Sequence, residues 1–318
     1  MNRLLPALIC LTLLLTAACS KDESVPVPAP PPKRLQVVTS LFPLYDFVRN
    51  IGGERVEVSL LLPPGVEPHG FDPKPDDLVR ISRADLFAYT NPLLEPWAAR
   101  VGATIDLKRV RVIDASAGIP LRKAVGKDDH DHDHDHGHGS AGESDPHLWL
   151  DFANAALMVN TLAEGLAAVD PGNRDFYLAN AATYRQQLVA LDEKYRATLA
   201  GCSSKVLLQG GHLAFGYLAE RYGLDYRAAT AVNPDAEPTP ARIAELVRQV
   251  RTHRLRYVFS EELVSPRLAE TIARETGAGV LPLNAAHSVN RAEFAGGVTF
   301  LALMERNLAN LATGLGCR

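Results

Sequence analysis

The sequence has no basic excess and none of the compact motifs that mark a local zinc site. Lys and Arg number 33 against 37 Asp and Glu, a net charge of −4, so we expect no positive surface of the kind that holds nucleic acid. No spacing of histidines or cysteines matches a zinc finger or an HExxH helix, which excludes those local motifs. A zinc finger or a metalloprotease-type helix is therefore not expected.

Cysteine is also scarce, with four in 318 residues. Cys10 and Cys19 lie in the N-terminal segment, which leaves Cys202 and Cys317 for the folded part. In an oxidising compartment such a pair predicts one disulfide. The alternative is two separate, buried thiols.

The N-terminus has only a short apolar run. Arg3 precedes apolar residues 4–16, a stretch well short of the ~20 residues that a membrane-spanning helix needs. A charged start, a short apolar run and small residues before a cut site predict an export signal over residues 1–18. A transmembrane anchor is the weaker alternative.

The expected cleavage site resembles a bacterial lipobox. It reads Thr16-Ala17-Ala18-Cys19, with Thr16 where the pattern prefers Leu. The resemblance implies a lipid anchor on Cys19, and the alternative is ordinary cleavage into a soluble secreted form. Residues 19–34 are rich in proline and predict an extended tether.

From residue 35 onward, β-rich runs alternate with helical patterns, which predicts an α/β fold with parallel sheets covered by helices. Strands are expected at residues 35–39, 56–62, 85–89, 110–113, 205–209, 226–229, 257–260 and 280–283. Helices are expected at residues 45–51, 152–169, 171–199, 213–222, 240–253, 266–276 and 294–315. This order predicts a first lobe over residues 35–170, a linker helix over 171–200 and a second lobe over 201–318.

The linker helix is predicted from apolar spacing. Its apolar face is expected to consist of Tyr177, Ala181, Tyr184, Leu188, Leu191 and Tyr195, which recur at intervals of four and three. Pro171 suits the first turn and Gly201 suits the stop. At ~1.5 Å per residue the helix would be on the order of 40 Å long, enough to serve both lobes.

Five of the ten histidines alternate with aspartates in one tract. They are His130, His132, His134, His136 and His138. The composition of this tract, within a loop over residues 126–144, cannot form a core and predicts disorder. We expect it to trap zinc weakly, and the alternative is a solvated loop without a physiological role.

Three further histidines lie next to predicted strands or helices. His69 follows the strand at residues 56–62, His147 precedes the helix at 152–169, and His212 follows the first strand of the second lobe. In open α/β sheets, ligands bind beyond the carboxyl ends of the strands. Neutral imidazoles from separate loops can share one borderline-soft ion such as Zn²⁺. The last two, His253 and His287, are expected at the surface.

Four segments carry a family resemblance. They read GVEPHGFDPKPDDL (residues 65–78), DPHLWLD (145–151), HLAFGYLAERYGL (212–224) and SPRLAETIARETGAGVLPL (265–283). In this order they resemble the signature segments of metal-binding receptors of bacterial ABC importers, especially zinc receptors of the ZnuA type. The likeness extends over residues 35–315. It implies two Rossmann-like lobes joined by one long rigid helix, with metal in the cleft between the lobes.

The resemblance also implies the metal ligands. His69 and His147 would come from the first lobe and His212 from the second. Manganese receptors of the family carry a carboxylate where His212 stands, so an imidazole there favours zinc.

The fourth ligand is less defined. Relatives place an aspartate after the last strand, where this chain has Leu283-Asn284-Ala285. Zinc usually takes four ligands, so the fourth position would fall to Glu67, Asn284 or water. Glu67 or water is favoured, because a neutral amide is a poor zinc ligand.

The resemblance therefore implies an extracytoplasmic or periplasmic, lipid-anchored zinc receptor that delivers Zn²⁺ as cargo to an ABC permease powered by a cytoplasmic ATPase. We expect a monomer without enzymatic activity. The alternatives are a manganese receptor of the same family, a metal buffer or adhesin, and a secreted zinc hydrolase, because three histidines with one open position also hold catalytic zinc.

Overall fold

The structure is a computed structural model that describes residues 34–123, 144–232 and 237–318. Residues 34–318 form one compact unit. The expected export signal, Cys19 with most of its tether, and the histidine tract at 130–138 lie outside the described residues.

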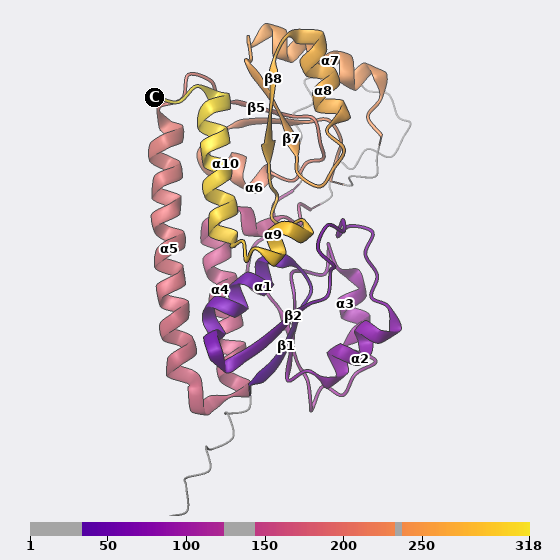
Figure 1. The fold of residues 1–318 in the computed structure, drawn as a ribbon, viewed down its shortest axis with the longest axis vertical. Coiled ribbons are helices and arrows are strands. Elements are labelled where there is room, and N and C mark those ends of the chain that lie inside the picture. The colour runs from indigo at the N-terminus through magenta and orange to yellow at the C-terminus, as the bar shows by residue number, and fades with distance from the viewer. Residues whose placement is uncertain (1–33, 124–143, 233–236) are drawn as a thin grey trace, which may run out of the picture. The chain divides into compact units, whose positions relative to one another are not determined.

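Two four-stranded parallel sheets form the framework of this unit (Figure 1). The first has the order β2-β1-β3-β4 and the second the order β6-β5-β7-β8, so both sheets have the same topology. The strands are β1 (Leu35–Thr39), β2 (Val56–Leu60), β3 (Leu86–Tyr89), β4 (Arg111–Asp114), β5 (Val206–Gln209), β6 (Asp225–Ala228), β7 (Tyr257–Glu261) and β8 (Gly279–Leu283). The predicted α/β fold with parallel sheets is confirmed.

The central strands β3, β5 and β7 are buried along most of their length, as expected for strands covered on both faces. In the first sheet Val37 of β1 pairs with Val58 of β2 and Leu86 of β3. In the second sheet Val258 of β7 pairs with Val280 of β8. The carboxyl ends of β2 and β5 lead into the loops that carry His69 and His212.

Helices cover these sheets and connect their strands. They are α1 (Phe42–Gly52), α2 (Pro75–Arg83), α3 (Pro96–Val101), α4 (Phe152–Val169), α5 (Arg174–Ala200), α6 (Gly216–Tyr222), α7 (Pro240–Thr252), α8 (Arg267–Thr276), α9 (Arg291–Ala295) and α10 (Phe300–Leu315). Short 3₁₀ turns are η1 (Gly53–Arg55), η2 (Leu148–Leu150) and η3 (Pro171–Asn173). By length and composition α4 could span a membrane, but its apolar face packs against α5, β3 and β4, as a core helix does.

The prediction of one helix over residues 294–315 is wrong. The chain leaves α9 through Gly296 and turns at Gly297, whose φ of +71° suits glycine. The hydroxyl of Thr299 then accepts a hydrogen bond from the Ala302 amide and caps a new helix, α10. The break lets the chain turn between β8 and α10.

The long helix α5 joins elements of both sheets. The predicted apolar residues of this helix are all buried, and α5 lies beside α4 and α10 (Figure 1). The Tyr184 hydroxyl donates to Asp46 of α1 at 2.9 Å, and the Tyr195 hydroxyl donates to the Met304 carbonyl of α10 at 2.6 Å. These buried bonds fix α5 against α1, which follows the first strand, and against α10, which follows the last.

The predicted disulfide is present. Cys202, just beyond α5, is bonded to Cys317, just beyond α10, across 115 residues of sequence. The bond closes the second half of the chain on itself. Long closed loops are the ones in which a cross-link restricts the unfolded chain most.

Candidate metal centre

The loop after β2 places His69 through an acidic residue two positions earlier. In Glu67-Pro68-His69, the Glu67 carboxylate accepts from the His69 amide at 3.1 Å and lies 2.5 Å from Nδ1 of the same histidine. The proline between them has a fixed φ angle, which reduces the number of conformations open to this turn. A carboxylate on Nδ1 fixes the tautomer with the hydrogen there, so the lone pair of His69 is on Nε2.

The same three-residue pattern recurs before α4. In Asp145-Pro146-His147, one carboxylate oxygen accepts from the His147 amide at 3.0 Å and lies 2.9 Å from its Nδ1. The other Asp145 oxygen receives Nη1 of Arg122 at 3.2 Å. The Asn91 side-chain amide donates to the Pro146 carbonyl at 2.9 Å, which fixes the middle residue of this turn. His147 therefore also presents Nε2.

His212 is placed by two glycines and a distant glutamate. Glu261, the last residue of β7, lies 2.6 Å from Nδ1 of His212. A Cβ on Gly211 would stand 2.9 Å from that carboxylate, and a Cβ on Gly210 would stand 2.6 Å from the backbone of Ala269. Both positions need glycine for β5 to bring His212 against Glu261.

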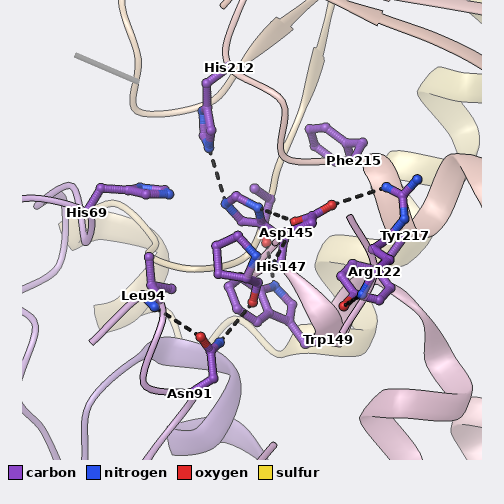
Figure 2. A network of polar contacts seen from close by, with 12 residues as sticks. His69, Asn91, Leu94, Arg122, Asp145, His147, Trp149, His212, Phe215 and Tyr217 are labelled. Atoms are coloured by element: carbon purple, nitrogen blue, oxygen red, sulfur yellow. Dashed lines mark hydrogen bonds and ion pairs between the residues drawn. The ribbon is translucent and has the colours of Figure 1, made fainter. Parts of the chain in front are cut away.

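The three imidazoles converge: in Figure 2 the rings of His69, at the left, and His212, above, both point toward the ring of His147. One nitrogen from each lies within 4.8 Å of one from each of the others. Nε2 of His147 is 3.3 Å from Nε2 of His212, and the three ring centroids are 5.0, 5.1 and 5.3 Å apart. His147 and His212 are buried, whereas the His69 side chain is 12% exposed and forms the accessible side.

Burial and neighbouring charges set the protonation of this centre. Burial, together with the nearby His212 and His69, holds the pKa of His147 well below its usual 6.5, so this ring stays neutral. Burial raises the pKa of Asp145 to about 6, although the His147 amide and Arg122 oppose that shift. Burial would also raise the pKa of Glu67, but hydrogen bonds from His287 and His69 outweigh it and hold that pKa far below its ordinary value.

The prediction that His287 lies at the surface is wrong. Its side chain is 2% exposed, and its Nε2 lies 3.6 Å from Oε2 of Glu67. The loop after β8 turns inward there, because the Trp149 indole donates to the Ala285 carbonyl at 2.7 Å. His253, by contrast, is exposed just beyond the end of α7, as expected.

The two residues suggested as a fourth ligand are both engaged. Glu67 is bonded to His69, as described above. The Asn284 side-chain oxygen accepts from the Ala286 amide at 2.6 Å, and its nitrogen donates to Glu262. Among the described residues, Glu67 does not belong to the group of His, Cys, Asp and Glu side chains whose ligand atoms converge with those of His69.

Sequence reasoning missed the carboxylates that orient the histidines. Glu67 and Asp145 were detectable, because an acidic residue, a proline and a histidine follow one another in both loops. Glu261 had no such signal, since it stands 49 residues from His212. Arg122 was missed for the same reason.

Comparison with known proteins places the chain in one family. Residues 37–314 match the family model ZnuA, described as zinc-uptake complex component A, periplasmic. The chain is 34% identical over 302 residues to the high-affinity zinc uptake system protein ZnuA of Bacillus subtilis, which covers 95% of this chain and 94% of that protein. It is also 34% identical over 311 residues to the zinc-binding lipoprotein AdcA of Streptococcus pneumoniae, covering 98% of this chain but 60% of AdcA.

The solved structures agree with this relationship. The Zn(II)-bound ZnuA-like domain of S. pneumoniae AdcA superposes with a TM-score of 0.75 at 32% identity, over 89% of this chain and 99% of that domain. The likeness thus covers both sheets and all the segments that carry the three histidines. The chain belongs to the ZnuA family, the periplasmic component A of zinc-uptake complexes.

Proposed function

We propose that this protein is an extracytoplasmic receptor that captures Zn²⁺ with His69, His147 and His212 and delivers it to a membrane importer. The observation that carries the proposal is the arrangement of these rings. Each has a carboxylate at Nδ1, and one nitrogen of each ring lies at a common centre, where Nε2 of His147 and Nε2 of His212 are 3.3 Å apart. In a histidine that binds metal, the N–H of the other ring nitrogen typically donates a hydrogen bond to such a group, which orients the ring and raises its basicity.

The spacing suits zinc. Zinc–nitrogen bonds of about 2.05 Å at tetrahedral angles put two ligand nitrogens about 3.3 Å apart, and the Nε2 atoms of His147 and His212 are 3.3 Å apart. The same geometry puts neighbouring ring centroids about 5.2 Å apart, against 5.0 to 5.3 Å here. Imidazole is also a better ligand for zinc than for manganese, which prefers oxygen.

The surroundings balance the charge of the ion. Glu67, Asp145 and Glu261 place three carboxylates behind the three rings. His147 is already neutral, so zinc has no proton to displace from that ring. Zinc would therefore enter a centre that has one ring held neutral by burial and a carboxylate at Nδ1 of each ring.

Delivery would use the partners that the family implies. These are an ABC permease, to which the receptor hands its cargo, and a cytoplasmic ATPase that powers transport. Cys19 would carry a lipid that holds the receptor at the membrane, and AdcA, a relative, is named a lipoprotein. The histidine tract at residues 130–138, which lies outside the described residues, would collect zinc weakly.

We infer also that the protein is a receptor and not a zinc hydrolase. The three carboxylates nearest the imidazoles each hold an Nδ1 atom. None of these three is free to act as a general base toward a zinc-bound water. Zinc-loaded protein should show no ester or peptide turnover above that of free zinc.

The test is a zinc titration of purified protein against a competing chelator. His212→Ala should weaken the tight site by more than the 10–100-fold typical of a residue outside the ligand set. His253→Ala is the matched control and should bind like the wild type, because His253 is exposed just beyond the end of α7. Deleting residues 128–138 should lower the stoichiometry and leave the tight site intact. Wild-type affinity in His212→Ala would contradict the proposal.

A further inference from the structure

A fourth histidine lies over the three that form the proposed zinc site. His287 belongs to the loop between β8 and α9, in which residues 284–289 are all buried. Its ring centroid is 6.2 Å from that of His69, 6.3 Å from His147 and 6.1 Å from His212. A ring centroid equally far from three others lies on the line that passes through the centre of their triangle, perpendicular to its plane. The fourth vertex of a tetrahedron lies on that line.

The distance to that vertex is small. With three rings bound at the corners of the triangle, a fully bound fourth ring would also stand about 5.2 Å from each of them. Centroid distances of 6.1 to 6.3 Å correspond to a ring about 1 Å too far from the metal position. A change of rotamer or a small loop shift covers such a distance.

The polar neighbours of His287 resemble those of the three ligands, with the roles of the two ring nitrogens exchanged. One nitrogen, Nε2, faces a carboxylate, Oε2 of Glu67, at 3.6 Å. The other, Nδ1, is buried and has no hydrogen-bond partner among the described residues. Nε2 of His69 is in the same condition. Buried polar atoms without partners are costly, and one cation at the shared centre would satisfy both.

The backbone before His287 is strained in a way that aims this residue inward. Ala286 has a φ of +60°, in the left-handed region that alanine seldom occupies. The Asn284 side chain accepts from the Ala286 amide at 2.6 Å and holds the turn, and the His287 carbonyl accepts from the Phe42 amide at 3.4 Å. Strain maintained by its surroundings tends to occur where a residue must be placed for function.

We infer that His287 supplies the fourth protein ligand through Nδ1, so that zinc is held by four imidazoles. The inference rests on the proposed function, since it adds to the same centre. Glu67 then contacts two of the ligands: its Oε1 lies against Nδ1 of His69, and its Oε2 faces Nε2 of His287. A site of four nitrogen ligands disfavours Mn²⁺ more than a site with three nitrogens and an oxygen.

The experiment combines X-ray absorption with affinity measurements. Wild-type protein loaded with sub-stoichiometric zinc, so that the tight site fills before weaker ones, should give a first shell of four nitrogens with the scattering of four imidazoles. His287→Ala should show three imidazoles and one light atom, and its zinc affinity should fall at least tenfold. His253→Ala, a histidine lost from the surface, should change neither result.

Folding of each variant is checked by thermal unfolding without metal. If His287→Ala does not fold, the imidazole count in wild-type protein and the affinity of His287→Gln decide the question. Three imidazoles in the wild type, or wild-type affinity in a folded His287→Ala variant, would overturn the fourth ligand. If His212→Ala still loses affinity in that case, the proposed function stands; if His212→Ala also binds like the wild type, both fail.

Discussion

Replacing Glu261 by glutamine tests whether the buried carboxylates strengthen the metal site. Glu261 has no exposed side-chain surface and lies 2.6 Å from Nδ1 of His212. A zinc ion on Nε2 of that ring would stand about 6 Å from the carboxylate, and at an effective dielectric of about 20 their attraction is about 5 kcal/mol as an upper bound. Glutamine keeps the shape and a hydrogen-bond acceptor, so only part of this is lost.

The expected loss in zinc affinity for Glu261→Gln is about 10–100-fold, or about 1.4–2.7 kcal/mol. It is measured by competition with a chelator of known affinity, at one pH and ionic strength. Glu262→Gln is the control, because Glu262 is the next residue and contacts Asn284 instead of a proposed ligand. A Kd for Glu261→Gln within threefold of the wild type would refute the idea that the negative charge of Glu261 strengthens zinc binding by His212.

Three further predictions concern stability. Burial raises the pKa of Glu95 to about 7, so its protonated form is favoured in the folded state and stability should fall as pH rises through 7. In Glu95→Gln that fall should be smaller, by at most about 3 kcal/mol, in denaturant titrations of metal-free protein at pH 5 and 8; parallel pH profiles would contradict this. Replacing Cys202 and Cys317 together by serine should lower the free energy of unfolding by about 3–5 kcal/mol, given their 115-residue separation, and reduction of the wild type should match it. Gly210→Ala should lower the free energy of unfolding by about 1–3 kcal/mol, because the new Cβ would meet the Ala269 backbone at 2.6 Å. An unchanged melting temperature would contradict this and show that the backbone moves to make room for the methyl group.

Sequence periodicity predicted the sheets and the long helix because each carries its signal locally. The apolar residues of α5 recur at helical spacing, and all of them are buried where the pattern puts them. The single helix expected at 294–315 failed for the opposite reason. Its apolar pattern continues through Gly296 and Gly297, and only the φ of +71° at Gly297 shows that the chain turns there.

The three converging histidines were found from their positions beside strands and helices and from family resemblance. Their carboxylate partners and His287 were not, since these depend on contacts between distant segments. His287 follows two alanines in a polar stretch, and nothing in those residues indicates burial. Its burial comes from Trp149 and Phe42, more than a hundred residues away in the chain. Local sequence carries no record of such contacts.

The division of the centre between the two sheets bears on how the metal could leave. His69 with Glu67, and His147 with Asp145, are carried by segments next to the first sheet, whereas His212 with Glu261 is carried by the second. Each ring therefore keeps its own carboxylate if the two sheets move apart. Among the described residues, the imidazole–carboxylate contact between the halves is the loosest of these, 3.6 Å between His287 and Glu67. Separation would break bonds to zinc without disturbing the orientation of His69, His147 or His212, so the emptied site would be ready for the next ion.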